Sequence, residues 1–161
     1  ASRVLDAGVR LPRPLSPHLS AALAGKPIST APLMDLVWSQ PDTDRWIVEG
    51  AGGVLVPLNE HELMVDLMAV LGLPVLIVSR SGLGTINHTL LTIEALRSRG
   101  IAVAGVVMQG EPNADNRVAI ETRGHVAVVG EVPRLDAVTP DAVQAASACL
   151  APGGELDAWF A

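Results

Sequence analysis

The sequence contains no tyrosine, one phenylalanine and three tryptophans, so aromatic side chains are scarce. Proteins that hold single-stranded nucleic acid stack its bases on aromatic side chains, and this chain has no such set. Its 11 Lys and Arg residues against 17 Asp and Glu residues give a net charge of −6. Because nucleic-acid binding requires clustered positive charge, we expect no nucleic-acid partner.

Cysteine is represented by Cys149 alone. A single thiol excludes an internal disulfide framework and a zinc site built from cysteines, as is typical of a reducing compartment such as the cytoplasm. Long hydrophobic runs are also lacking: stretches such as 73–78 are much shorter than the ~20 residues of a membrane-spanning helix. We therefore expect a cytoplasmic protein with no membrane partner. The first residues show no secretory signal and no initiator methionine, which predicts that the natural chain continues upstream.

What the sequence does contain is a regular alternation of apolar runs and helical periodicity. The runs predict strands at 46–48, 74–78, 101–107 and 126–129, and the 74–78 run is typical of a strand buried on both faces. Helices are predicted from Ser16-Pro17 to Gly25, from Ser29 or Thr30 onward, and over 60–71, 85–99, 114–123 and 140–150. The pattern indicates βαβ units, so we predict a single α/β domain over residues 1–161 with a mainly parallel sheet.

Ligands of open α/β sheets bind at the carboxyl ends of the strands, where this sequence has two glycine-rich turns. In the first, Glu49 ends an apolar run and Gly50-Ala51-Gly52-Gly53 follows. A carboxylate there can hold Mg²⁺ beside a phosphate while the glycines permit close backbone approach. An exposed acidic residue before a flexible turn would leave the same pattern, and the spacing alone does not separate the two interpretations.

The second turn, Gly82-Leu83-Gly84, leads from the 74–78 run into the predicted helix at Thr85. Free N–H groups and the dipole of a helix start form an anion site. Taken alone, an ordinary turn with Thr85 as the helix cap is the favoured interpretation, since a single Gly-x-Gly is a weak signal. The histidines are scattered and no Gly-x-Ser-x-Gly motif occurs, so no catalytic residue is assigned.

Three segments taken together are much more specific than any one of them. The strings Trp46-Ile-Val-Glu-Gly-Ala-Gly-Gly-Val-Leu-Val-Pro-Leu58, Leu73-Pro-Val-Leu-Ile-Val78 and Leu83-Gly-Thr-Ile-Asn-His-Thr-Leu-Leu-Thr92 resemble dethiobiotin synthetase in order and spacing. Ser16-Pro-His18 upstream, Ala104-Gly105 and Gly130-Glu-Val-Pro133 downstream also fit. The resemblance covers nearly the whole chain, from about residue 16 to about residue 150.

The resemblance implies a P-loop NTPase-like three-layer α/β fold and a homodimer. It also implies a reaction: the ureido ring of dethiobiotin is closed from 7,8-diaminononanoate and CO₂ with ATP and Mg²⁺. In that family the diamine is first carbamated, ATP phosphorylates the carbamate, and the second amine displaces phosphate. Such phosphoryl chemistry depends on metal and positive charge more than on a covalent nucleophile.

The resemblance also implies roles for individual residues. Glu49 matches the family's acidic Mg²⁺ ligand, which also contacts the nucleotide. The substrate, with its carboxylate received from the neighbouring subunit, is implied to contact Gly53, Gly84, Thr85, Ile86 and Asn87. The nucleotide is implied to contact Gly50, Ala51, Gly52, Gln109, Gly130, Val132 and Pro133.

The chain departs from the family pattern in two places. No Gly-x-x-x-x-Gly-Lys-Ser/Thr sequence occurs, so the N-terminal strand, the Walker A loop and the family's catalytic lysines are absent from the 161 residues. The chain thus corresponds to the C-terminal two-thirds of a longer enzyme or to a naturally truncated relative. Gln109-Gly110 stands where the family often has Asn-Asp. Two alternatives stay open: a non-catalytic binding or dimerising subunit, and a cobyrinate-amidase-type synthetase.

Overall fold

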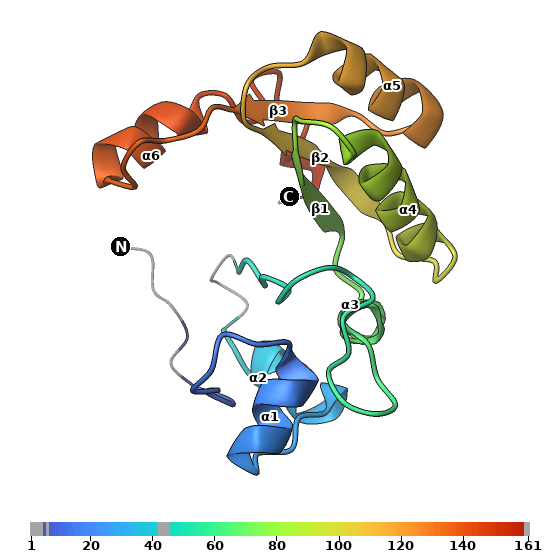
Figure 1. Cartoon of the computed structure of the whole chain (residues 1–161), viewed down its shortest axis with the longest axis vertical. Coiled ribbons are helices and arrows are strands. Elements are labelled where there is room, and N and C mark those ends of the chain that lie inside the picture. Colours follow the sequence, from blue (N-terminus) through green and yellow to red (C-terminus); the bar gives the residue numbers. More distant parts are fainter. Residues whose placement is uncertain (1–4, 6, 42–45, 160–161) are drawn as a thin grey trace. The chain divides into compact units, whose positions relative to one another are not determined.

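The computed structural model describes residues 5, 7–41 and 46–159. Within it the chain divides into two compact units, residues 1–72 and residues 73–161 (Figure 1). Each unit is described by itself below. That the whole chain forms one domain stays a prediction.

The first unit contains helices α1 (Pro17–Ala24), α2 (Thr30–Trp38) and α3 (Met64–Leu71). Helix α1 begins as predicted: Ser16 is its N-cap and Pro17 takes the first helical position, where proline's missing N–H costs nothing. It ends at Gly25 in the left-handed conformation. Helices α2 and α3 pack against each other. Buried side chains of this unit include Ile28, Leu58, Met64, Val65, Leu67 and Leu71.

The predicted strand at 46–48 is wrong. Residues 46–50 have no regular secondary structure, and the side chains of Ile47 and Val48 are 86% and 43% exposed. An apolar run becomes a strand only where a second strand offers its backbone groups, and none among the described residues does so for this run. The predicted helix at 60–71 is shorter in the structure, because residues 59–62 form a turn before α3.

The second unit is built on a three-stranded sheet of β1 (Val75–Arg80), β2 (Val103–Gln109) and β3 (Val128–Val132). The strand order is β1-β2-β3 and both pairings are parallel, with Ile77 opposite Val106 and Val106 opposite Val128. Helices α4 (Thr85–Arg97) and α5 (Ala114–Gly124) supply the crossovers. The predicted α/β class with a parallel sheet is confirmed.

Helices α4 and α5 pack side by side on one face of the sheet (Figure 1). Between them and the sheet lie Ile77, Ile93, Leu96, Val106, Ile120 and Val128, all buried. Burial of strand β1 is one-sided, since Val78 is 71% exposed and Leu76 is 39% exposed. The expected burial of this strand on both faces is therefore not seen within the described residues.

After β3 the chain forms helix α6 (Pro140–Ser147), which buries none of its residues, and the short 3₁₀ turn η1 (Asp157–Trp159). Between them the segment 149–151 returns to the outer edge of β3. There Gly130 and Leu150 form an antiparallel bridge, and the N–H of Ala151 donates to the carbonyl of Val129. No helix among the described residues is both long and apolar enough to cross a membrane.

Candidate functional site

The Glu49–Gly53 turn belongs to the first unit. Glu49, Ala51, Gly52 and Gly53 are exposed, and Gly50 is half-buried against α3. A Cβ at Gly50 would lie 3.1 Å from the terminal methyl carbon of Met68, so the backbone here approaches the helix closely. Gly52 has a φ of +86°, a conformation that glycine adopts without steric cost. The turn thus presents the Glu49 carboxylate and a nearly bare backbone to solvent.

The far end of this turn is anchored to the start of α3. The N–H groups of Met64 and Val65 donate to the carbonyls of Val56 and Val54, each at 2.8 Å. These are first-turn N–H groups, which no carbonyl within a helix can satisfy. The chain after Gly53 is therefore held in place by the helix start.

No group of three or more His, Cys, Asp or Glu side chains able to hold a metal is found among the described residues. Mg²⁺ differs from structural metals because it usually takes one or two carboxylates and completes its shell with waters and phosphate oxygens. The exposed carboxylate of Glu49, set before a glycine-rich backbone, fits that donor set as one ligand. It does not form a complete metal site by itself.

The second predicted site lies at the start of α4, in the other unit. Gly84 is the N-cap, with a φ of +91° and no side-chain cap. Among the described residues no acceptor is found for the N–H groups of Gly84, Ile86 and Asn87. Asn87 is exposed beside them. The positive end of the helix dipole and the free donors make this turn suitable for an anion such as a carboxylate.

Thr85 does not cap this helix with its side chain. It is 5% exposed, and its hydroxyl oxygen lies 3.5 Å from that of Thr89 inside the unit. Its own N–H donates to the carbonyl of Gly82. Thr85 therefore faces the interior, and Asn87 is the predicted substrate residue of α4 whose polar side chain is exposed.

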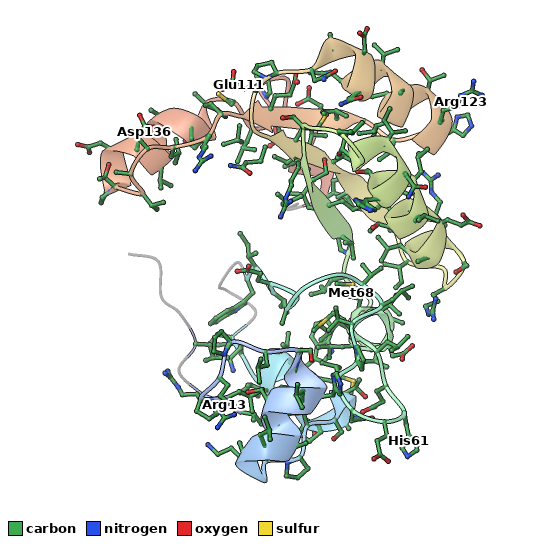
Figure 2. The ribbon with its side chains drawn as sticks, in the orientation of Figure 1. Arg13, His61, Met68, Glu111, Arg123 and Asp136 are labelled. Carbon is green, nitrogen blue, oxygen red and sulfur yellow. The ribbon has the colours of Figure 1, made fainter. Side chains whose placement is uncertain are left out.

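Backbone hydrogen bonds join the carboxyl ends of the three strands. The N–H of Ser81, after β1, donates to the carbonyl of Gln109 at 3.0 Å, and the N–H of Gly110, after β2, donates to the carbonyl of Val132 at 2.9 Å. These bonds bring the turn before α4, Gln109 and Val132 to one edge of the sheet. Gln109 and Glu111 are exposed there, and Figure 2 shows Glu111 on the turn after β2.

The exposure of the segment from Gly130 to Pro133 increases along the chain. Gly130 is buried, and a Cβ on it would lie only 2.7 Å from the carbonyl oxygen of Cys149. Val132 is half-buried and Pro133 is exposed. A small open cavity of about 240 Å³ lies on this outer side of β3, and Glu131 and Glu155 contribute to its lining. The part of the segment accessible to a ligand is therefore its end.

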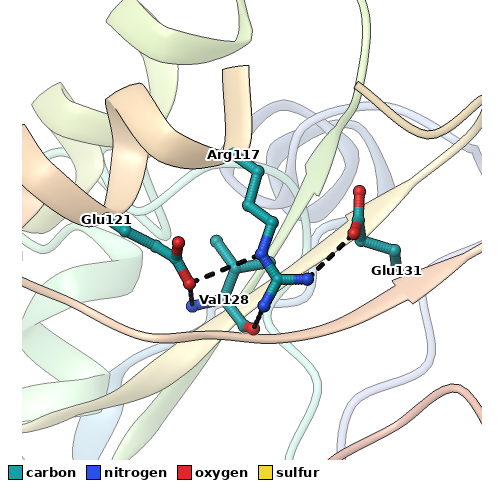
Figure 3. Close-up of polar contacts among 4 residues, drawn as sticks. All are labelled: Arg117, Glu121, Val128 and Glu131. Atoms are coloured by element: carbon teal, nitrogen blue, oxygen red, sulfur yellow. Dashed lines mark hydrogen bonds and ion pairs between the residues drawn. The ribbon is translucent and has the colours of Figure 1, made fainter. Parts of the chain in front are cut away.

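Two polar side chains that the sequence analysis did not single out lie at the start of α5 and bond to the strand ends. Asn116 donates through Nδ2 to the carbonyl of Ser81 at 2.8 Å. Arg117 donates to the carbonyl of Val128 at 3.0 Å and to Glu131 at 2.9 Å (Figure 3). The hydrogen bond to Glu131 raises the pKa of Arg117 above its usual value. The one sequence signal for this cluster is Asn113, which caps α5 by accepting from the N–H of Asn116.

Arg117 also forms an ion pair with Glu121, with Nε and Oε1 3.5 Å apart. Glu121 in turn accepts the N–H of Val128 at 3.1 Å. Both peptide groups of Val128 that face α5 are thus bonded to its side chains (Figure 3).

Of the predicted site residues, Glu49 to Gly53 lie in the first unit, and the remainder lie in the second. The second unit brings the start of α4 together with Gln109 and Val132, as the strand-end argument predicts. Gly130 lies farther back on β3, beneath the 149–151 segment. The assigned roles of all these residues stay predictions.

Comparison with known proteins identifies related chains. The model of the AAA_26 family, described as an AAA domain, matches residues 1–142. The ATP-dependent dethiobiotin synthetase BioD of Paramagnetospirillum magneticum is 51% identical over 140 residues, which cover 86% of this chain and 66% of that protein. The protein of the same name from Lawsonia intracellularis is 44% identical over 126 residues, covering 78% of this chain and 60% of that protein.

A third relative is named as a bifunctional protein. The biotin biosynthesis bifunctional protein BioCD of Bordetella avium is 48% identical over 134 residues, which cover 83% of this chain and 28% of that protein. The chain thus spans about two-thirds or less of the length of each of these relatives. The resemblance to dethiobiotin synthetase and the expected P-loop NTPase-like α/β fold are confirmed by these matches.

Proposed function

The chain belongs to the AAA_26 family, and we propose that it acts in the ATP-dependent closure of the ureido ring of dethiobiotin from 7,8-diaminononanoate and CO₂. The relatives named dethiobiotin synthetase, at 44% and 51% identity, support this activity. They also favour it over a cobyrinate-amidase-type synthetase and over a binding subunit without catalysis. The observation that carries the proposal within this chain is the open anion site at the start of α4.

That site suits the carboxylate of the diamino acid. The substrate has one fixed negative charge, at the end remote from its reacting amines. The unpaired N–H groups of Gly84, Ile86 and Asn87 can receive this charge without a Lys or Arg. The exposed amide of Asn87 can add a hydrogen bond to the carboxylate, which contributes about 1.5–3 kcal/mol when the acceptor is charged. Gly53, exposed in its own unit, is proposed as a further substrate contact.

The phosphates of ATP are proposed to be held at the Glu49 turn. Mg²⁺, when bound with ATP, neutralises charge that develops on the transferred phosphoryl group. Glu49 would contribute one carboxylate ligand. The backbone of Gly50, Ala51 and Gly52 would lie close to the phosphate oxygens because no large side chain intervenes.

The base of ATP is proposed to lie at the carboxyl ends of β2 and β3. Gln109 is exposed there, and the end of the Gly130–Pro133 segment is accessible at Val132 and Pro133. An amide side chain both donates and accepts hydrogen bonds, so Gln109 can pair with the edge of a purine base. Gly130 is buried against the 149–151 segment, so we propose that it contributes to the backbone position of β3 rather than touching the base.

We also propose that the protein is a cytoplasmic homodimer in which the start of α4 lies near the subunit interface. The family resemblance is the main support for the dimer. Exposed leucines on this side of the second unit are compatible with it, since Leu83 is fully exposed and Leu91 is 54% exposed. The scarcity of cysteine supports a reducing compartment.

The substitution Asn87→Ala tests the proposed substrate site. We expect it to weaken binding of 7,8-diaminononanoate about tenfold, the equivalent of one charge-assisted hydrogen bond, and to leave ATP binding within twofold. Calorimetric titration of each ligand into the full wild-type protein and the variant measures both affinities. Glu94→Ala is the matched control, because Glu94 is exposed on the same helix and distant from its start.

Two results would contradict the proposal. Equal loss of both ligands in Asn87→Ala, with Glu94→Ala unchanged, would mean that the start of α4 is structural. Failure of the wild-type protein to bind 7,8-diaminononanoate at all would contradict the proposed activity itself.

A further inference from the structure

Helix α5 carries two neighbouring side chains that bond in different directions. Asn116 reaches the carbonyl of Ser81, between β1 and α4, whereas Arg117 reaches Val128 and Glu131 on β3. Successive residues of an α-helix point about 100° apart, because a turn takes 3.6 residues. One helix start is therefore connected to two different edges of the candidate site.

The contact of Asn116 secures a residue that is already fixed on its other side. Ser81 is 6% exposed, and its N–H is held by the carbonyl of Gln109. A Cβ at Gly110 would lie 2.5 Å from the Ser81 hydroxyl, so the two backbones pack closely. With the Asn116 amide on its carbonyl, both peptide groups of Ser81 are held in place.

The turn that follows Ser81 has little support of its own. Its residues Gly82, Leu83 and Gly84 are all exposed. Within this turn the N–H of Thr85 donates to the carbonyl of Gly82 at 3.2 Å. At its far end the turn is held by the start of α4, where the N–H of His88 donates to the carbonyl of Gly84 at 3.1 Å and Thr85 is buried. At its near end it is held through Ser81, so the contact of Asn116 helps to set the direction in which the turn enters α4 and the positions of the free N–H groups.

The contacts of Arg117 act on β3 in the same way. Its guanidinium bonds the carbonyl of Val128 and the carboxylate of Glu131, and so spans the strand up to the residue before Val132. The planar guanidinium presents several donors in fixed directions and can hold two acceptors at once. Glu131 is the neighbour of the segment end that we propose to face the base.

We propose that Asn116 and Arg117 are positioning residues for different ligands. Asn116 fixes the position of the turn that receives the substrate carboxylate, and Arg117 fixes the position of the strand end that receives the nucleotide base. This inference rests on the proposed function. Neither side chain needs to touch a ligand, since each acts through the backbone that it holds.

The experiment compares Asn116→Leu with Arg117→Met in the full protein. Leucine has nearly the shape of asparagine but no donor, and methionine keeps much of the arginine stem without the guanidinium. We expect Asn116→Leu to weaken 7,8-diaminononanoate binding roughly five- to tenfold with ATP binding within twofold. Arg117→Met is expected to give the reverse pattern. Asn113→Ala is the control, since it removes the side-chain cap of α5 but neither the Asn116 amide nor the Arg117 guanidinium.

Amide hydrogen exchange supplies a readout that needs no ligand. Exchange is expected to rise at the hydrogen-bonded amides of Ser81 and Thr85 in Asn116→Leu and at residues 130–132 in Arg117→Met, with neither change in Asn113→Ala. This split would not follow from a general weakening of α5, which would raise exchange in both segments together.

The outcomes separate the inference from the proposed function. If the wild type binds both ligands and the variants lose both affinities equally, or if Asn113→Ala reproduces their pattern, the positioning roles are wrong while the proposed function stands. If the wild type binds no 7,8-diaminononanoate, the proposed function is wrong, and the assignment of these two side chains to ligands is overturned with it.

Discussion

Removing the charge of Glu62 should destabilise the first unit measurably. Glu62 accepts hydrogen bonds from the backbone N–H and the hydroxyl of Thr30 and from the amide of Asn59. Thr30 opens α2, and the side chain of the N-cap Ser29 makes no cap bond. A glutamate 32 residues away thus caps this helix. Glu62→Gln keeps the shape of the side chain and removes its negative charge.

The magnitude follows from the donors that Glu62 holds. The oxygen of glutamine can still accept from Thr30, but its NH₂ group would face the amide nitrogen of Asn59. Asn59 cannot turn over without cost, because its Oδ1 accepts the N–H groups of His61 and Glu62. Hydrogen bonds to charged groups contribute about 1.5–3 kcal/mol and neutral ones about 0.5–1.5 kcal/mol. Because the site is half-exposed, we expect a loss of about 1–2 kcal/mol in the free energy of unfolding.

The loss should also depend on pH in a defined direction. The hydrogen bonds from Thr30, followed by that from Asn59, lower the pKa of Glu62 below its usual range. A carboxyl group whose pKa is lower in the folded state stabilises the fold above its unfolded-state pKa, about 4.3 for glutamate. That stabilisation disappears as the pH falls through the folded-state pKa. The difference between wild type and Glu62→Gln should therefore be full at pH 7 and shrink below about pH 4.

Urea denaturation followed by tryptophan fluorescence measures this effect, since Trp38 and Trp46 both lie in the first unit. Glu60→Gln is the matched control, because it removes the same charge from an exposed side chain two positions away from Glu62. Two results would refute the reasoning. One is a Glu62→Gln loss no larger than that of Glu60→Gln, and the other is a loss that persists unchanged at pH 3.

Three further predictions concern the second unit, the metal ligand and the assembly. Gly130→Ala would place a Cβ 2.7 Å from the carbonyl oxygen of Cys149. It should therefore displace the 149–151 segment, cost about 1–3 kcal/mol, and speed the labelling of the Cys149 thiol. Glu49→Gln should lower synthetase activity about tenfold to a hundredfold, and an unchanged rate with unchanged Mg²⁺ dependence would leave Glu49 as a turn residue. Light scattering of the chain should give twice its 16.7 kDa mass, and a monomer mass over a wide concentration range would exclude the dimer.

Most helices and strands of the second unit could be predicted from the sequence. Helix α4 begins at Thr85, the predicted residue, and α5 ends within one residue of its predicted end. The strand predictions at 74–78 and 101–107 lie within two residues of β1 and β2 at each end. These predictions succeed because caps, glycine stops and apolar periodicity act over a few neighbouring residues.

The candidate site was predictable only where it depends on such local patterns. The glycine turn before the predicted helix made an anion site one of two interpretations; the structure confirms that the helix begins at Thr85 and leaves N–H groups at its start free, while binding of an anion there stays a proposal. The side chains that bond to the neighbouring strand ends could not be found in this way. Asn116 bonds a residue 35 positions earlier, and no spacing rule links the two.

Local sequence alone determined where helices begin and end, which runs are apolar, and which turns can expose backbone N–H groups, since each depends on a few adjacent residues. The tertiary structure decided which strands pair and which distant side chains form hydrogen bonds. The run at 46–48 is as apolar as other strands but has no strand partner among the described residues, whereas the run at 128–132 has β2 beside it. It also decided that Glu62 caps α2 and that Asn116 and Arg117 hold two strand ends. Hydrogen bonds between distant residues form only once folding has brought their groups within about 3 Å, and no local pattern encodes that approach.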